Sequence, residues 1–135
     1  MSTTSLLPLI FSNLVIVETV MTDTKLLIST QARATPAQCP KCGVVSSQYH
    51  SSYFRYVQDT PIGLCLVWLQ ITVRRFRCAN PNCQQQTFSE QHPDLVSRRC
   101  RRTKRLLSNL VQIGLALGGA AGARLAVKLA MAVWR

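Results

Sequence analysis

The sequence predicts an α+β protein in which a β-hairpin and a strand-rich ribbon are followed by a basic helical segment. Three observations lead to this prediction. Two short cysteine pairs, Cys39/Cys42 and Cys78/Cys83, flank a middle rich in β-branched and aromatic residues. β-Branched residues are also concentrated before the first pair, and apolar residues recur at helical spacing after the second. We expect three parts: a hairpin packing segment over residues 1–35, a ribbon domain over 36–95 and a helix-turn-helix-like segment over 96–135.

The N-terminal part is predicted to contain the hairpin. Residues 5–17 are strongly apolar, which leaves a secretory signal as an alternative, but a proline and an asparagine interrupt the run and no basic residue precedes it. We therefore expect a short helical or irregular stretch before a strand from Leu14 to Val20. Turn-forming residues separate this strand from a second one over Lys25 to Thr30. We expect the hairpin to cover apolar surface of the ribbon.

The ribbon itself is predicted to be built from two long strands and a short one. Residues 47–57 alternate polar and aromatic groups, and residues 59–63 supply the chemistry of a turn. The longest strand candidate runs from Leu64 to Phe76, and a last short strand covers Thr87 to Glu90. Alternate positions of the long strand give one apolar face: Cys65, Val67, Leu69, Ile71 and Val73.

From Ser97 the pattern becomes helical. A first helix with a very basic first turn and a half is predicted, because apolar residues recur at three- and four-residue intervals from Leu106 to Leu117. Gly118 and Gly119 end or bend it, and residues 120–133 form a second, alanine-rich helix. Two helices joined by a glycine-containing turn form a helix-turn-helix skeleton.

The charge balance favours a polyanionic partner. Lys and Arg number 16 against 5 Asp and Glu, which gives a net charge of +11 and a pI near 10.2. Neutralising phosphates releases counterions, although the charge alone does not separate DNA from RNA or an anionic membrane. A dense cluster in the first helix is easier to understand if phosphates neutralise it, since like charges destabilise a helix. It comprises Arg98, Arg99, Arg101, Arg102, Lys104 and Arg105. A second cluster, which ordinary solvation explains equally well, comprises Arg74, Arg75 and Arg77.

The four paired cysteines predict one structural Zn²⁺ site. Zinc prefers four soft donors at tetrahedral angles, and two short pairs present four thiolates as two knuckles. Gly43, directly after the first pair, supports a tight knuckle. The alternative is redox chemistry, but redox folds carry one such pair and not two. The predicted ligands are Cys39, Cys42, Cys78 and Cys83.

No chemistry is assigned to the remaining cysteines and histidines. Cys65 is expected to be a small core residue, and Cys100 lies among arginines with no histidine near it in sequence. His50 and His92 are alternative metal ligands, which four cysteines make unnecessary. A chain without a recognisable secretory signal is expected in a reducing, cytosolic compartment.

A membrane location is a further alternative. Leu106 to Ala123 is an 18-residue run without a charge that contains two Gly-x-x-x-Gly patterns. Polar residues inside the run, its two adjacent glycines and the cations Arg124 and Lys128 directly after it argue against a membrane span.

Several motifs occur together and in order. They are Cys39–Gly43, Tyr49–Arg55, Asp59–Pro61, Val73–Cys78, Phe88–Glu90, Arg101–Leu106 and Gly118–Ala126. In this combination residues 36–131 resemble the N-terminal part of insertion-sequence transposases of the ISL-three type, in which a zinc ribbon precedes a helix-turn-helix.

The resemblance implies binding of double-stranded DNA at the terminal inverted repeats of a mobile element. The ribbon would hold the fold and touch the DNA backbone, while the helices enter a groove, so Arg124 and Lys128 join the expected DNA contacts. The family's larger domain uses acidic residues to bind two metal ions. The five acidic residues here all precede the helices. We therefore expect a truncated, non-catalytic chain with an incomplete helix-turn-helix.

The same resemblance implies a cytoplasmic, nucleoid-associated protein that acts on no small-molecule substrate. Full-length transposase or a second copy of the chain is a further expected partner. The alternatives that stay open are a free-standing zinc-ribbon adaptor that binds protein and, less favoured, a membrane-associated protein.

Overall fold

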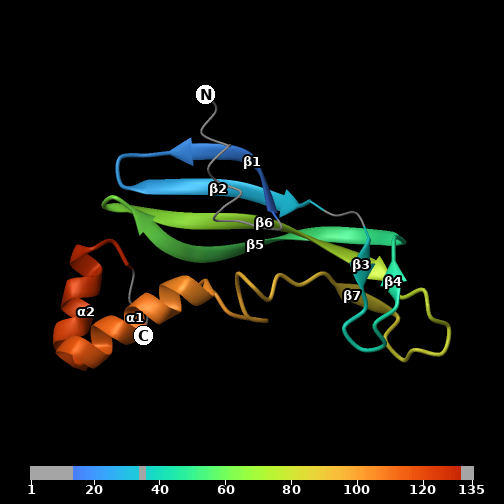
Figure 1. Cartoon of the computed structure of the whole chain (residues 1–135). Coiled ribbons are helices and arrows are strands. Elements are labelled where there is room, and N and C mark those ends of the chain that lie inside the picture. Colours follow the sequence, from blue (N-terminus) through green and yellow to red (C-terminus); the bar gives the residue numbers. More distant parts are fainter. Residues whose placement is uncertain (1–13, 34–35, 132–135) are drawn as a thin grey trace.

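The computed structural model describes residues 14–33 and 36–131, and it confirms the α+β class. The strands are β1 (Leu14–Met21), β2 (Lys25–Ala32), β3 (Ala37–Gln38), β4 (Val45–Ser46), β5 (Tyr49–Ile62), β6 (Cys65–Arg77) and β7 (Thr87–Ser89). The helices are α1 (Lys104–Leu117) and α2 (Gly119–Lys128). Figure 1 shows the two helices at one end of the molecule and β3 and β4 at the other. The stretch expected before the hairpin, residues 5–13, lies outside the described residues.

The main sheet joins the hairpin to the ribbon in the order β1-β2-β6-β5, and β7 also pairs with β6. The prediction that the hairpin covers the ribbon is wrong. Instead, β2 lies beside β6 in parallel, with Leu27 opposite Trp68. An open β6 edge would leave backbone N–H and C=O groups without partners, and β2 satisfies them. The hairpin therefore widens the sheet and does not form a second layer.

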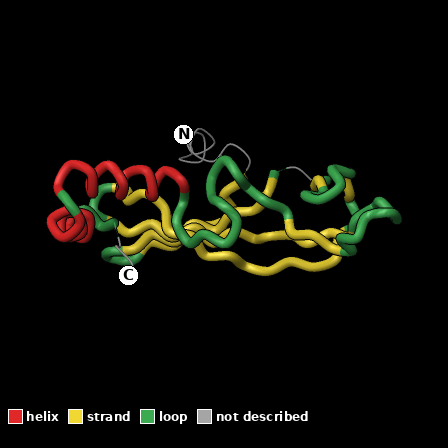
Figure 2. The backbone as a smooth tube through the Cα atoms, turned by 90° about the horizontal axis from the view of Figure 1, so that it is seen from below, coloured by secondary structure: helices red, strands yellow, loops and turns green. Residues whose placement is uncertain are grey.

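One face of the sheet carries the main core. Alternate β6 residues Val67, Leu69, Ile71 and Val73 are at most 2% exposed, as their alternation predicts. We call the face on which they lie the inner face. Val57 of β5 and Val96 of the β7–α1 connection pack against them. Figure 2 shows this connection and α1 along one side of the strands.

Burial changes face towards the end of the main sheet that lies beside β3 and β4, which form a separate two-stranded sheet. Phe76, on the opposite face of β6, is 1% exposed and packs with Phe88 and Cys39 in a second, smaller core. By the same alternation, Arg75 and Arg77 belong to the inner face, where both are exposed. The two arginines therefore project on the side of the sheet that carries α1.

Strand β5 runs further than predicted. The residues expected to form a turn, 59–62, continue the strand, and the turn is at Gly63–Leu64, where Gly63 has φ +60°. Pro61 is tolerated within β5 because β5 is an edge strand. Asp59, at the start of this stretch, is buried and pairs with Arg105 of α1.

Helix α1 begins at Lys104 and not at Ser97 as predicted. Thr103 is extended and its Oγ1 accepts a hydrogen bond from the Leu106 N–H, so it caps the helix. The residues before it run beside β5, because the Gln58 N–H donates to the Arg101 carbonyl and the Thr103 N–H donates to the Gln58 carbonyl. Of the six clustered cations, only Lys104 and Arg105 therefore belong to the helix. The expected repulsion between like charges within one helix does not apply to the other four.

Helix α2 follows α1 after Gly118, whose φ is +80°. It was predicted to reach residue 133, but it ends at Lys128 and Ala130 has a φ of +61°. No helix in the described part of the chain is long and apolar enough to cross a membrane.

The two helices approach each other closely at Gly122. A Cβ added there would lie 3.3 Å from the Gly114 Cα and the Ile113 carbonyl oxygen, whereas a Cβ added at Gly114 would meet nothing within 4 Å. Alanine favours helix over glycine by up to about 1 kcal/mol. We therefore expect Gly114→Ala to raise the melting temperature and Gly122→Ala to lower it. Equal stabilisation by both substitutions would show that the helices separate without cost.

Candidate metal centre and basic surface

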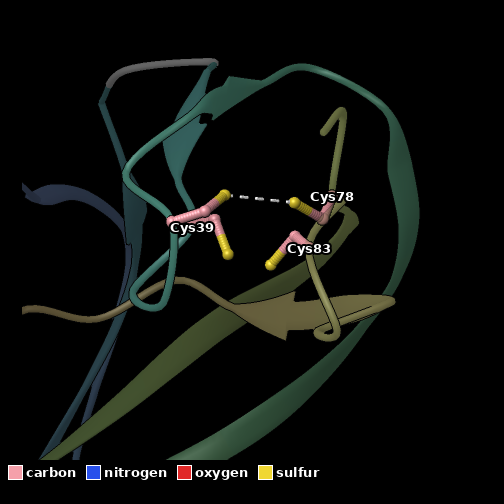
Figure 3. A group of neighbouring side chains, drawn as sticks. Cys39, Cys78 and Cys83 are labelled. Carbon is pink, nitrogen blue, oxygen red and sulfur yellow. Dashed lines mark hydrogen bonds between the residues drawn. The ribbon is translucent and has the colours of Figure 1, made fainter. Parts of the chain in front are cut away.

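The four predicted cysteines meet in one place. Their sulfur atoms all lie within 4.8 Å of one another, and the Cys42 and Cys78 sulfurs are 3.5 Å apart. Figure 3 shows the sulfurs of two loops pointing towards a common point. A Zn–S bond of about 2.3 Å in a tetrahedron requires sulfurs about 3.8 Å apart. The group therefore fits one structural Zn²⁺, as predicted.

Each cysteine pair lies in a tight backbone loop. Between β3 and β4, the Gly43 N–H donates to the Cys39 carbonyl at 2.9 Å, and Gly43 has φ +78°. Most residues avoid this left-handed conformation, so the structure confirms the tight turn that Gly43 predicted. After β6, the Cys83 N–H donates to the Asn80 carbonyl at 3.1 Å. Local turns thus orient both pairs towards the metal position.

The thiols compete for ionisation. A hydrogen bond from the Val44 backbone N–H lowers the pKa of Cys42 to about 7. The Asn80 backbone N–H also favours the Cys78 thiolate, but burial and the three other sulfurs outweigh it and raise the pKa of Cys78 to about 12. Four adjacent negative charges are unfavourable without a cation. A divalent ion of the charge and softness of Zn²⁺ supplies the missing positive charge.

Aromatic rings support the cysteines on the β6 side. Phe76 stacks on Phe88 with ring centroids 5.9 Å apart and meets Tyr49 edge-on. The Arg74 guanidinium lies 5.0 Å from the Phe76 ring centroid, and its Nε is 2.7 Å from a Glu90 carboxylate oxygen. Arg74, one of the expected DNA contacts, therefore takes part in the packing of the metal end.

The other candidate residues lie apart from the four cysteines. Among the described residues the metal-binding group contains no histidine. His50 Nδ1 pairs with the neighbouring Ser51 hydroxyl, and His92 is buried. Cys65 is half-buried at the start of β6, and Cys100 packs at the edge of the main core.

The clustered cations separate into two groups. Arg98, Arg99, Arg101 and Lys104 are exposed. Arg102 is half-buried. Arg105 pairs with the buried carboxylate of Asp59, and the Arg105 Nε lies 2.7 Å from the Asp59 Oδ1. On α2, Arg124 and Lys128 are exposed. Arg98 and Arg99 lie on the inner side of the sheet, as Arg75 and Arg77 do, and Arg101 and Lys104 follow along the open edge of β5. We call these six the basic surface: Arg75, Arg77, Arg98, Arg99, Arg101 and Lys104.

Two residues that hold this surface were not identified from the sequence. Arg55 and Asp59 of β5 flank the buried Val57 at alternate positions. The Arg55 guanidinium donates to the carbonyls of Ser97 and Cys100, at 2.8 and 2.6 Å. A sequence prediction that continued this strand to residue 62 would have placed Arg55 and Asp59 on the same buried face as Val57. Charged side chains on a buried face need partners, so their partners could then have been expected.

Comparison with known families identifies the cysteine-containing segment. Residues 35–83 match the family described as the zinc-finger of transposase IS204/IS1001/IS1096/IS1165. Comparison with curated proteins and with solved structures gave no match. The matched segment contains all four cysteines of the metal centre and the two long strands that connect them. Residues 35–83 therefore form a zinc ribbon of the kind found in the ISL3-type transposases, and the match covers this segment of the chain.

Proposed function

We propose that this chain binds double-stranded DNA through its basic surface, as the DNA-binding zinc-finger part of an insertion-sequence transposase. The DNA would be the terminal inverted repeats of the mobile element. The observation that carries the proposal is the set of exposed cations on a segment that is fixed to the sheet by its backbone. Fixed cations lose little conformational freedom when they meet phosphates.

The metal centre has a structural role in this proposal. A site with four cysteine ligands has no open coordination position for water or substrate, unlike catalytic zinc sites. Its contribution is to join the separate β3–β4 sheet to the end of β6, which carries Arg75 and Arg77. The zinc ribbon itself is therefore a binding module and not a catalytic one.

The contacts would be made mainly to the DNA backbone. Helix α1 exposes apolar side chains such as Val111 and Leu115, at 56% and 77%, and its cations are confined to its first turn. Phosphate contacts position a protein on DNA, whereas base contacts select a sequence. On α2, Arg124 and Lys128 are the described residues that we propose as additional contacts. A protein with this role would act in the cytoplasm at the nucleoid, alone or with full-length transposase.

The test compares two variants of equal charge. Arg101→Gln/Lys104→Gln removes two cations from the basic surface, whereas Lys25→Gln/Lys41→Gln removes two exposed cations from β2 and the first cysteine loop. Each lost phosphate contact lowers the slope of log affinity against log salt concentration by about 0.9. At about 0.1 M salt, this change corresponds to about an eightfold loss of affinity. We expect a loss of about sixtyfold for the first variant and less than threefold for the second. Binding is measured by fluorescence anisotropy on labelled duplexes over a salt series.

Two outcomes would contradict the proposal. Equal losses for both variants would show only a general effect of net charge. A wild-type chain that holds one zinc ion but binds no duplex would favour the zinc-ribbon adaptor, and recovery of one defined protein without nucleic acid would support it. Comparing an inverted-repeat duplex with a scrambled one tests whether the described residues select sequence.

A further inference from the structure

A tight turn presents two of the exposed arginines. The Cys100 N–H donates to the Ser97 carbonyl at 3.1 Å, so Arg98 and Arg99 are the two central residues of the turn. Both side chains are exposed, and the turn lies on the inner face between the buried Val96 and the start of α1. The tip of the turn therefore carries two adjacent positive charges into solvent.

Arg99 has an unfavourable backbone conformation. Its φ is +64°, in the left-handed region, and among the described non-glycine residues only Ala130 shares a positive φ. A residue with a Cβ incurs a steric cost there that glycine avoids. Residues held in such conformations occur preferentially at functional sites, where the surrounding structure maintains them. Folding alone would favour glycine at this position.

Arg55 maintains the turn. Its Nη2 donates to the Ser97 carbonyl at 2.8 Å and to the Cys100 carbonyl at 2.6 Å, so one nitrogen joins both ends of the turn. Arg55 belongs to β5, where it pairs with Ile71, so the turn is tied to the central strands. Charge-assisted hydrogen bonds of this kind are stronger than neutral ones. The backbone of Arg98 and Arg99 is thereby held in place by the protein itself.

We propose that the Arg98–Arg99 turn is a preformed site for the phosphodiester groups of DNA, and that Arg55 is the positioning residue that maintains it. This inference rests on the proposed DNA binding and names the part of the basic surface that contacts phosphate in a fixed geometry. The strained conformation of Arg99 is retained because a guanidinium is needed at the tip of the turn. Arg55 contributes to affinity without contacting DNA.

The central test is Arg99→Gly, which removes both the cation and the unfavourable conformation. We expect this variant to melt at the same or a higher temperature than the wild type while binding a duplex about eightfold more weakly at about 0.1 M salt. Its salt slope should fall by about 0.9. Lys25→Gln, which removes one exposed cation from the opposite face, should leave both affinity and slope unchanged.

Arg55 is tested separately, because a merely structural role would also change stability. In Arg55→Met we expect the Cys100 amide to exchange faster with solvent, zinc to stay at one per chain, and duplex affinity to fall severalfold. Arg55→Lys, which keeps a charged donor at this position, should restore part of that affinity.

The outcomes separate this inference from the proposed function. If Arg99→Gly binds like the wild type while Arg101→Gln/Lys104→Gln is weakened, the turn is not a phosphate site, although the protein still binds DNA. A lower melting temperature for Arg99→Gly would overturn the strain argument, and wild-type affinity in Arg55→Met would overturn the positioning role. A wild-type chain that binds no duplex overturns both this inference and the proposed function.

Discussion

Cys39→Ser is expected to reduce zinc from one ion per chain to almost none and to unfold the β3–β4 end of the protein. Cys39 is 1% exposed and packs against Phe76 and Phe88, so it joins the metal to the smaller core. A serine hydroxyl is a poor zinc ligand, and three thiolates leave the tetrahedron open. Structural zinc contributes apparent binding energies of about 10–16 kcal/mol, comparable to the whole stability of a typical domain.

Zinc content is measured by mass spectrometry of the metal, and unfolding by circular dichroism with and without a chelator. We expect the wild type with chelator to melt like Cys39→Ser without it. The control is Cys65→Ser, which makes the same chemical change at a half-buried cysteine outside the metal group. Cys65→Ser should keep one zinc ion per chain. A Cys39→Ser protein that also keeps one zinc ion would mean that three cysteines suffice.

The metal centre could be predicted because its chemistry depends on few residues. Two cysteine pairs at short spacing are typical of a zinc site, and Gly43 marks the backbone conformation that the first loop requires. The long strand β6 was equally readable, since alternate apolar residues from Val67 to Val73 leave one register for the buried face. In both cases the signal is carried by residue type and local spacing, even though the two cysteine pairs meet across thirty-six residues between Cys42 and Cys78.

What escaped prediction depends on contacts between distant residues. The parallel pairing of β2 with β6 joins segments about forty residues apart, and nothing in either segment specifies its neighbour. The start of α1 is set by Thr103, whose neighbours are held beside Gln58 of β5. Without that contact, the basic residues before Thr103 are acceptable helix formers, so the helix was predicted to begin too early.

Arg105→Met is expected to destabilise the fold by about 3 kcal/mol, because it leaves a buried carboxylate without its counterion. Asp59 is 2% exposed and accepts hydrogen bonds from the Arg105 guanidinium and, at 2.8 Å, from the Thr103 hydroxyl. The Thr60 N–H also donates to it at 2.8 Å. Because the Thr103 hydroxyl and the Thr60 N–H still donate to Asp59 in the variant, the loss of stability should lie near the lower end of the range for a broken buried ion pair. Chemical denaturation followed by circular dichroism measures the change.

Lys104→Met is the matched control, since it removes an exposed cation from the same helical turn and should change stability by no more than about 0.5 kcal/mol. In the double variant Asp59→Asn/Arg105→Met the buried charge is gone, so part of the lost stability should return. Equal stability of Arg105→Met and Lys104→Met would mean that solvent already screens the Asp59–Arg105 ion pair. The expected difference would show that one basic cluster contains two kinds of cation, because Arg105 holds α1 on the sheet while its neighbour Lys104 is available to DNA.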